Sequence, residues 1–545
     1  MMCKVCHDAH QFDRLRSRCT GALRTAAACL ALVAVAAFCI PSMSAAGDAV
    51  QRVPSVQQGA QAACTMQVPV LVVGGTPAGV AAAVTAARMG QDVVETEARP
   101  YLGGDLTGAM LNMLDMDFAP DGRHLAQGVF LEIYQKLGMT FDVEYAKRVF
   151  MHLVQREPLI TLKLRTQPVA VVMRGRWVTG VEFEDAARHV TETICAQRIV
   201  DATDDADIAA MAGVPYTIGR EGSGIDRAMM SATLVFELGG VDWRGVVSAI
   251  TGSTTRHIMR GGVFRGNVWG YGPIMRMYRP TQPGVAIYDL NIGQQNERSV
   301  LINGLLVFGV DGTDPASVAD AIQRARAELP HLIEFLRDMA PGFEHAYLIR
   351  IADYLYIRET RHIRGLYTLT AQDIVDGRVF WDAIGVANYP IDLHPYHPGE
   401  VNPFAPRRYL YTIPFRSLVP VGVGNLLVAS RSISASYEAA GSARVVPTTM
   451  EEGQAAGAAA VLSIRAKLSF KQFAERPQVV RNLQATLHTQ GAYFTAETLA
   501  AIGGTSGEVT TEAPAQTQSQ APSQTQSTSW QDRPGQPGSP AGGKH

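Results

Sequence analysis

Residues 68–90, VPVLVVGGTPAGVAAAVTAARMG, limit the fold of this chain more than any other stretch. The uncharged, β-branched run PVLVV is typical of a parallel strand buried on both faces. The glycines that follow allow a sharp turn, and an Ala-rich helix over residues 78–89 would direct its free N–H groups at a phosphate. We predict that one short segment binds a dinucleotide pyrophosphate: Gly74, Gly75, Thr76, Pro77, Ala78 and Gly79.

Thr76 departs from the usual fingerprint of such a turn. The pattern G-x-G-x-x-G would have its second glycine at position 76. A hydroxyl beside a helix N-terminus is able to hydrogen-bond a phosphate oxygen, so Thr76 is compatible with the same site. The turn alone does not distinguish NAD from FAD.

The next strand, in QDVVETEARP, ends in a carboxylate that suits a ribose. Glu97 lies 18 residues after Gly79, where an acid receives the ribose hydroxyls. A carboxylate at this position repels a 2′-phosphate and so disfavours NADP. Two alternatives stay open: Glu95 lies on the same face of the strand, and Glu97 could serve only to cap a turn.

The composition of the whole chain is that of an ordinary globular protein. Its 545 residues are 47% hydrophobic and 18% charged, with a formal net charge of -2. This length provides core for two or three domains. A near-neutral charge balance gives no reason to expect a nucleic-acid partner.

The N-terminal segment, residues 1–45, has the pattern of a secretory signal peptide. Several arginines precede the apolar run TAAACLALVAVAAFCIP, which leads into small residues. This pattern predicts a periplasmic or secreted protein with no membrane span after cleavage. An uncleaved anchor is one alternative, although the run is shorter than the roughly 20 residues of a spanning helix. Translation from Met43 is another, and would leave the protein cytoplasmic.

Two further segments lack the composition of a packed core. Residues 503–545 are rich in Gln, Ser, Thr, Pro and Gly and nearly free of aliphatic side chains. Such a segment buries too little apolar surface to offset its ordering entropy, so we expect a disordered tail. Residues 46–66 are expected to form a shorter linker of the same kind.

A second glycine pair after Glu97 favours FAD over NAD. The segment ARPYLGGDLTG places Gly103 and Gly104 shortly after this acid. With VVGGTPAG, VE and LGG in this order, the chain resembles the bacterial FAD-dependent oxidoreductases of the two-dinucleotide-binding-domain flavoprotein class. In that family the middle fingerprint glycine is commonly replaced, as it is here by Thr76.

Three later blocks carry the same resemblance: residues 197–216, 356–370 and 413–460. The first contains Ala202 and Thr203, which by resemblance pass near the flavin phosphates. It has Asp204 where the family has glycine, and aspartate tolerates a left-handed backbone better than most residues. In the last block, Arg431 and Met450 precede a small-residue helix, GQAAGAAA, whose N-terminus in this class points at the flavin pyrimidine.

The resemblance implies an α/β fold with a Rossmann-like FAD-binding domain of the glutathione-reductase type. This domain would comprise residues 67–205 and 406–502, with an inserted α+β substrate or cap domain at 206–405. Four alternating segments between residues 150 and 198 (LITLKLRT, PVAVVMRG, WVTGVEFEDA and TETICAQRIV) are expected to form a β-meander. Val169 in this meander would offer its backbone to the adenine.

Cys64 and Cys195 are the two cysteines outside the predicted signal peptide. If the strands around Val70 and Val200 are neighbours, both cysteines lie at the end of the sheet away from the cofactor. We hypothesise a disulfide between them, which suits an oxidising compartment. Two buried thiols are the alternative.

The function implied by the resemblance is hydride transfer between a small organic substrate and N5 of FAD, with reoxidation by oxygen or a quinone. The alternatives are an NAD-dependent dehydrogenase and a non-catalytic flavin-binding exported module. An Arg–His pairing suits an anionic substrate and proton delivery, and four candidates fit this role: Arg358, Arg361, His362 and His394.

Other polar side chains near these candidates leave alternatives open. Arg358 and Glu359 could instead form a structural ion pair. Asp115 and Asp117 either approach the flavin or cap a helix. Asp392 and His397 accompany His394, but His394-x-x-His397 lacks a third ligand at suitable spacing, so no metal site is predicted.

Overall fold

The computed structural model describes residues 55–58, 63–119, 121–185, 188, 190–252, 259 and 261–492. The chain divides into two units, residues 1–51 and 52–545, and the first lies outside the described residues. The predicted signal peptide at 1–45 and the predicted tail at 503–545 also lie outside them.

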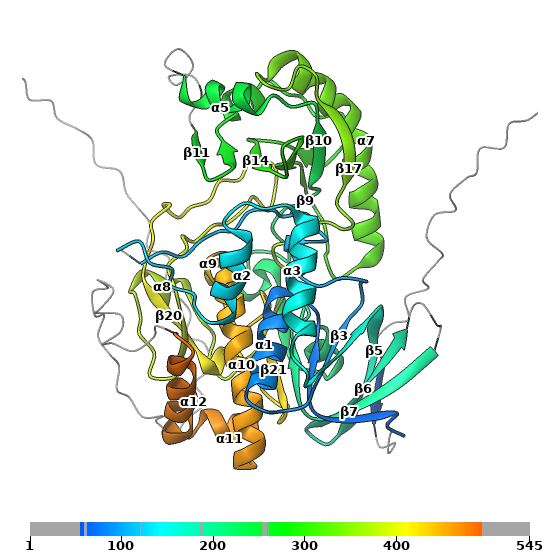
Figure 1. The fold of residues 1–545 in the computed structure, drawn as a ribbon, viewed down its shortest axis with the longest axis vertical. Coiled ribbons are helices and arrows are strands. Elements are labelled where there is room, and N and C mark those ends of the chain that lie inside the picture. The colour runs from blue at the N-terminus through cyan, green and yellow to red at the C-terminus, as the bar shows by residue number, and fades with distance from the viewer. Residues whose placement is uncertain are drawn as a thin grey trace, which may run out of the picture. The chain divides into compact units, whose positions relative to one another are not determined.

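A parallel sheet forms the centre of the described chain, as the α/β prediction requires (Figure 1). Its strands follow the order β21, β7, β2, β3 and β4, and every neighbouring pair is parallel. Their bounds are β2 (Met66–Val73), β3 (Val93–Glu97), β4 (Ile160–Leu164), β7 (Val190–Asp201) and β21 (Leu426–Val428). The helix α1 (Pro77–Arg88) follows β2 directly, which confirms the predicted strand–turn–helix unit.

The β-meander contains three of the four predicted segments. β5 (Thr166–Arg174), β6 (Trp177–Asp185) and the first part of β7 pair antiparallel. The first segment, LITLKLRT, was wrongly expected in the meander, because β4 pairs parallel with β3. Two helices, α2 (Val129–Leu137) and α3 (Val143–Gln155), connect β3 to β4, and such a crossover permits the parallel pairing. Alternation of apolar residues does not reveal strand direction.

A further strand, β1 (Ser55–Gln58), lies within the segment expected as a linker, residues 46–66. It pairs parallel with β5 at the edge of the sheet. The four residues of this strand therefore belong to the sheet of the nucleotide-binding unit.

The second helix of the nucleotide-binding unit, α10 (Val446–Ala466), packs directly on α1. A Cβ atom on Gly453 would lie 2.0 Å from the Ala78 carbonyl oxygen, and one on Gly457 would lie 2.2 Å from that of Ala82. Only glycine permits so close an approach of two backbones. The spacing of these glycines thus brings the N-terminus of α10 close to the turn before α1.

In sequence, a mixed α+β region separates the two halves of the nucleotide-binding unit, and Figure 1 shows it at the top of the view. Its six-stranded antiparallel sheet has the order β11, β12, β14, β15, β10 and β17, and the long helix α7 (Pro315–Met339) accompanies it. The strands are β10 (Phe236–Gly239), β11 (Gly262–Phe264), β12 (Asn267–Trp269), β14 (Asn291–Gln294), β15 (Ser299–Asn303) and β17 (Tyr347–Ile351).

The apolar clusters divide the chain differently from the predicted domain boundaries. One cluster joins the six-stranded sheet to α7 and α5 (Trp243–Thr251), and extends in sequence to Leu355. Residues after Leu369, including β19 (Ala383–Ala387), pack instead in the cluster of α10 and α12 (Pro477–Thr489). Residues 206–405 therefore contribute to more than one apolar cluster, and the domain boundaries remain a prediction.

Shorter elements complete the described fold. The helices are α4 (Asp207–Met211), α6 (Gly272–Met275), α8 (Ala371–Val375), α9 (Tyr437–Ala443) and α11 (Phe470–Ala474). The strands are β8 (Tyr216–Ile218), β9 (Ala232–Thr233), β13 (Val285–Ala286), β16 (Leu306–Val307), β18 (Arg361–Ile363) and β20 (Tyr411–Pro414). Short 3-10 helices cover Gly104–Leu106, Gly219–Ser223 and Phe415–Ser417.

Cys64 and Cys195 form a disulfide, with their Cα atoms 5.6 Å apart. The predicted neighbours are in place, since Val72 of β2 pairs with Val200 of β7. The bond lies upstream of the carboxyl ends of both strands. The hypothesis of a disulfide is confirmed, and the alternative of two thiols is wrong.

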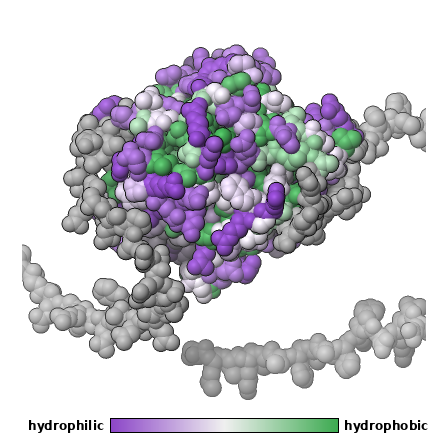
Figure 2. Space-filling model, turned by 90° about the horizontal axis from the view of Figure 1, so that it is seen from below, coloured by the Kyte–Doolittle hydropathy of each residue, from purple (hydrophilic) through white to green (hydrophobic). Residues whose placement is uncertain are grey.

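No helix in the described part of the chain is long and apolar enough to cross a bilayer. Hydrophilic and hydrophobic residues alternate over the face seen in Figure 2.

Candidate active site

Thr76 is the N-cap of α1. Its hydroxyl accepts a hydrogen bond from the Gly79 N–H at 3.1 Å and donates one to the Ala202 carbonyl at 2.9 Å. The hydroxyl is therefore used within the protein, and its predicted contact with a phosphate remains a prediction. The backbone N–H groups of Thr76 and Ala78 have no hydrogen-bond partner within the described chain, and these are the donors available to an anion.

The turn residues before α1 are packed too closely for side chains. Gly74 has a positive φ of 106°, and a Cβ atom there would lie 2.5 Å from the Ala202 carbonyl oxygen. A Cβ on Gly75 would lie 2.3 Å from Leu102. The turn thus needs glycine at both positions, as the sequence predicts.

Glu97 and Glu95 occupy different environments on β3. The Glu97 carboxylate accepts hydrogen bonds from the N–H groups of Gly75 at 2.8 Å and Arg99 at 2.9 Å. It supports the turn, as one alternative proposed, and it also lies at the carboxyl end of the strand, where a ribose would bind. Glu95 is fully buried and neither of its carboxyl oxygens has a partner among the described residues. Burial, with the charge of Glu97 adding to it, raises the pKa of Glu95 to about 8.

The second glycine pair is joined to the first. The Gly103 N–H donates to the Gly75 carbonyl at 2.8 Å, and Gly103 has a φ of 104°. A Cβ atom on Gly103 would lie 2.7 Å from the Phe150 ring. This contact directs the chain into the 3-10 helix Gly104–Leu106, which carries Asp105 toward the carboxyl edge of the sheet.

Arg431 is enclosed by three carboxylates at this edge. Its guanidinium lies 2.7 Å from Asp205, 3.3 Å from Asp105 and 3.6 Å from Asp204. Burial raises the pKa of Asp105 to about 7, and the neighbouring carboxylate of Asp204 adds to this shift. The left-handed residue of this loop is Ala206, with a φ of 52°, so the argument that Asp204 adopts that conformation is wrong.

The other residues predicted to contact the cofactor lie near the same edge or in the meander. Ala202 donates its N–H to Val73, and the Thr203 hydroxyl donates to Asp201 at 2.6 Å. The ladder between β5 and β6 shifts register between Pro168 and Ala170, so Val169 lies at a β-bulge. A bulged residue leaves backbone groups unpaired, as the predicted adenine contact requires. The cofactor roles of these residues remain predictions.

The helix α10 begins earlier than predicted. It starts at Val446, seven residues before Gly453, because Pro447 occupies a first-turn position that suits proline. The N–H groups of Val446 and Thr448 have no hydrogen-bond partner within the described chain. Met450 was predicted to bind the cofactor, but its side chain is only 1% exposed and packs in the apolar cluster with α1 and α3.

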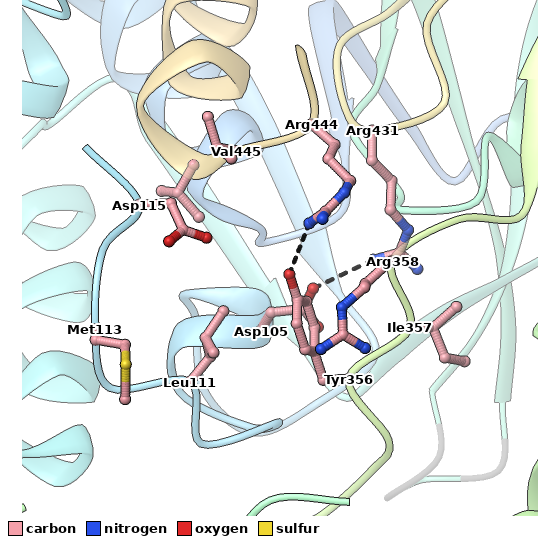
Figure 3. A pocket seen from close by; sticks show the side chains of 11 residues that line it. Asp105, Leu111, Met113, Asp115, Tyr356, Ile357, Arg358, Arg431, Arg444 and Val445 are labelled. Carbon is pink, nitrogen blue, oxygen red and sulfur yellow. Dashed lines mark hydrogen bonds and ion pairs between the residues drawn. The ribbon is translucent and has the colours of Figure 1, made fainter. Parts of the chain in front are cut away.

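A cavity with an empty volume of about 390 Å³ lies at the N-terminus of α10 (Figure 3). This volume includes space that is open to solvent. Acidic, basic and apolar side chains line the cavity: Asp105, Leu111, Met113, Asp115, Tyr356, Ile357, Arg358, Arg431, Arg444, Val445 and Val446. The segments that supply them are far apart in sequence.

Arg358 and Arg444 are two buried cations of this cavity. The Arg358 guanidinium donates to the Ser231 carbonyl at 2.7 Å and to the Thr233 hydroxyl at 2.8 Å. No ion pair between Arg358 and Glu359 forms, so that alternative is wrong. Arg444 donates to the Tyr356 hydroxyl at 2.9 Å and lies 3.2 Å from the Asp392 carboxylate.

His394 lies beside the cavity rather than in its lining. Its Nε2 is 3.4 Å from the Asp392 carboxylate, which also contacts Arg444. Although 30% of its side-chain surface is accessible, burial of the ring lowers the pKa of His394 to about 4, and the positive charge of Arg358 contributes. His394 is therefore a neutral imidazole at pH 7, in which form it can accept a proton.

Two predicted catalytic residues are engaged elsewhere. Arg361 donates to the Asp205 carbonyl at 2.7 Å and pairs with Asp207 at 2.9 Å. The buried His362 ring lies 2.9 Å from the Glu359 carboxylate. Neither lines the cavity. Their catalytic roles remain predictions.

Asp115 and Asp117 take up different positions near the cavity. Asp115 lines it, and burial raises its pKa. Asp117 accepts hydrogen bonds from the Asn388 N–H and the Thr448 hydroxyl, each at 3.1 Å. Neither residue caps a helix, so that alternative is wrong. His397 contacts Asp226 at 3.1 Å.

Sequence reasoning missed Arg444 and Tyr356 as residues of the cavity. Arg444 stands in the block of residues 413–460 that carries the family resemblance, two residues before α10 begins. A basic residue just before the N-terminus of a helix that faces a ligand was the available signal. No signal marked Tyr356, which the antiparallel contact between residues 233 and 356 brings to the cavity.

The arrangement fits FAD. It offers two helix N-termini with unpaired N–H groups, two glycine turns joined to each other, and a cavity beside them. The buried nitrogen atoms Nε of Arg358, Arg431 and Arg444 have no partner among the described residues, although all three side chains reach the cavity. Unpaired buried polar groups of this kind call for a polar ligand.

The chain matches a model of one protein family, described as FAD dependent oxidoreductase, over residues 69–487. No curated protein matches it. Among solved structures it is similar to a geranylgeranyl bacteriochlorophyll reductase-like protein from Thermoplasma acidophilum, with 11% identity over 80% of this chain and 87% of that chain, at a TM-score of 0.39. It is also similar to p-nitrophenol 4-monooxygenase from Pseudomonas putida, with 11% identity over 80% and 92% of the two chains, at 0.38.

Proposed function

Because the chain belongs to the FAD-dependent oxidoreductase family, and FAD is therefore its cofactor, we propose that it transfers hydride between a small organic substrate and N5 of the flavin. We propose oxygen or a quinone as the final acceptor. When bound, FAD supplies the redox chemistry, and the protein supplies position, charge and proton transfer.

The observation that carries this proposal is the cavity at the N-terminus of α10. The free N–H groups of Thr76 and Ala78 would bind the pyrophosphate, and Glu97 would bind the ribose. The free N–H groups of Val446 and Thr448, together with the helix dipole, would stabilise negative charge on the reduced ring. The remaining lining residues would contact substrate.

Proton transfer falls to His394 in this proposal. A neutral imidazole accepts a proton when an alcohol or amine loses hydride, and the adjacent Asp392 stabilises the imidazolium that forms. Apolar side chains of the cavity, Leu111, Met113 and Val446, would limit the access of water.

We also propose that the protein is exported. The disulfide between Cys64 and Cys195 supports an oxidising compartment. Cell fractionation of the native host, followed by immunodetection, tests this. Detection of the protein only in the cytoplasm would contradict it.

The test of the function is anaerobic reduction of the bound flavin. The purified protein should show the absorption spectrum of oxidised flavin, and one class among alcohols, amines, carboxylic acids and unsaturated acids should bleach it in the absence of oxygen. If the protein is yellow but no compound of these classes changes the redox state of its bound flavin, a non-catalytic flavin-binding module would be favoured. A colourless protein that takes up no FAD would contradict the proposal altogether.

A further inference from the structure

Arg358 is a buried cation with no ion-pair partner in the described chain. The residue is only 3% exposed, yet the groups that its guanidinium contacts are all neutral: the Ser231 carbonyl, the Thr233 hydroxyl and the Tyr356 ring, whose centroid lies 4.4 Å away. Its Nε atom has no partner among the described residues. A buried charge is costly unless an opposite charge or a strong hydrogen-bond acceptor compensates it.

The carboxylates near Arg358 are already engaged. Asp392 is bound by Arg444 at 3.2 Å and by His394 at 3.4 Å. Asp115 also lines the cavity, but no ion pair joins it to Arg358. Arg444 adds a second positive charge in the same lining (Figure 3). Among the described residues, Arg358 therefore has no carboxylate within ion-pair distance.

The third cation of the lining, Arg431, is compensated. Arg431 contacts Asp105, Asp204 and Asp205, so it has no need of an added anion. Arg358 is thus the one cation of the described lining that no carboxylate pairs with. A monoanion matches this charge, whereas a phosphate dianion would exceed it.

The apolar residues of the lining indicate the chemistry of the uncharged part of the ligand. Leu111, Met113, Ile357, Val445 and Val446 present apolar side chains to the same cavity as Arg358. A ligand with one anionic group and an apolar body would satisfy both surfaces. The planar fork of a guanidinium is matched by a carboxylate, which accepts two parallel hydrogen bonds.

We infer that the substrate of the proposed redox reaction is a small carboxylic acid with an apolar body, whose carboxylate binds Arg358 and Arg444. This inference rests on the proposed function, because it names the substrate of that reaction. Binding of the carboxylate can nevertheless be measured without any turnover. The flavin itself is the competing partner for Arg358, because a reduced flavin also carries negative charge.

Sodium benzoate and sodium hexanoate test the inference, with benzamide and hexanamide as uncharged matched compounds. Binding to the FAD-loaded protein is followed by perturbation of the flavin absorption spectrum. The acids should bind at least about tenfold more tightly than the amides, since a hydrogen bond to a charged group contributes about 1.5–3 kcal/mol. Equal affinity of acid and amide, or no binding by either acid, would overturn the inference.

Variants locate the site. Arg358→Met should weaken benzoate binding about tenfold or more, and Arg358→Lys should weaken it less, because lysine keeps the charge but loses the planar fork. Arg198→Met is the matched control: Arg198 is also buried, but it donates to Ser463 and Leu468 and does not line the cavity. It should leave benzoate affinity unchanged.

Two further readouts separate this inference from its rivals. If Arg358→Met shifts the flavin reduction potential and leaves benzoate affinity unchanged, Arg358 serves the flavin and the inference fails. If the protein binds no FAD, the proposed function fails, and thermal denaturation of the colourless protein with benzoate or benzamide still tests the anion site. Should Arg358→Met not fold, the comparison of acid with amide on the native protein decides.

Discussion

Glu95 is a carboxyl group enclosed within the parallel sheet. Neither of its oxygens has a partner in the described chain, and burial raises its pKa to about 8. In an unfolded chain this pKa returns to an ordinary value near 4.5. The folded protein therefore binds one more proton than the unfolded protein between these two values.

Stability should fall as the pH rises from about 4.5 to about 8, because Glu95 must ionise inside the sheet. Glu95→Gln keeps the shape and removes this proton, so its free energy of unfolding should decrease less over the same range. Urea denaturation at pH 5 and pH 8 measures both proteins. An identical pH dependence of native protein and variant would contradict the assignment.

His394 responds to the charge of Arg358. Burial and this nearby cation lower its pKa to about 4. A carboxylate bound at Arg358 should offset the positive charge and raise the pKa of His394. Histidine resonances titrated by NMR, with His394→Gln for assignment, measure this pKa. A value near 6.5 that benzoate does not change would contradict the prediction.

Thr76 illustrates how much of the site could be predicted from single residues. The glycines of the turn, the ribose acid and the second glycine pair follow from backbone geometry that only certain residues allow. The cap that the Thr76 hydroxyl makes with Gly79 is local, but its contact with Ala202 depends on the segment after β7, 126 residues away. No local pattern contains that information.

The helices α1 and α10 position the site. Their backbones come close together where Gly453 and Gly457 of α10 pack on α1. The apolar, small-residue composition of α10 predicted a helix, but its start at Val446 was missed because Val-Val-Pro-Thr-Thr has low helix propensity. Burial against α1, α2 and β19 outweighs this propensity. Tertiary contacts therefore set the N-terminus that faces the cavity.

Gly453→Ala should displace α10 from α1. The added Cβ would lie 2.0 Å from the Ala78 carbonyl oxygen, a backbone atom that cannot move alone. We expect a loss of about 1–3 kcal/mol in the free energy of unfolding and a lower FAD content, because the helix N-terminus shifts. Thermal denaturation and the flavin-to-protein absorbance ratio measure these effects.

Gly222→Ala serves as the matched control, since its Cβ would meet only ordinary contacts, the nearest at 3.5 Å. It should preserve both stability and FAD content. If Gly453→Ala behaves like this control, the close helix contact does not determine the position of α10.

At the scale of the whole molecule, the α/β class and the β7–β2 neighbourhood were predictable, because buried strands and glycine turns have strong local signals. The packing of residues 370–405 in the core of α10 and α12 was not predictable, because short apolar segments do not reveal which core they join. The cavity also escaped prediction, since it is lined by segments around residues 111, 358 and 444 that only the complete fold brings together.

A crystal structure of the FAD-loaded protein tests the central claim most directly. Density for the pyrophosphate is expected at the N-terminus of α1, beside Thr76 and Ala78. The isoalloxazine ring is expected in the cavity that Val446 and Arg358 line. Density for the ring outside this cavity, with side chains filling the space between Val446 and Arg358, would contradict it.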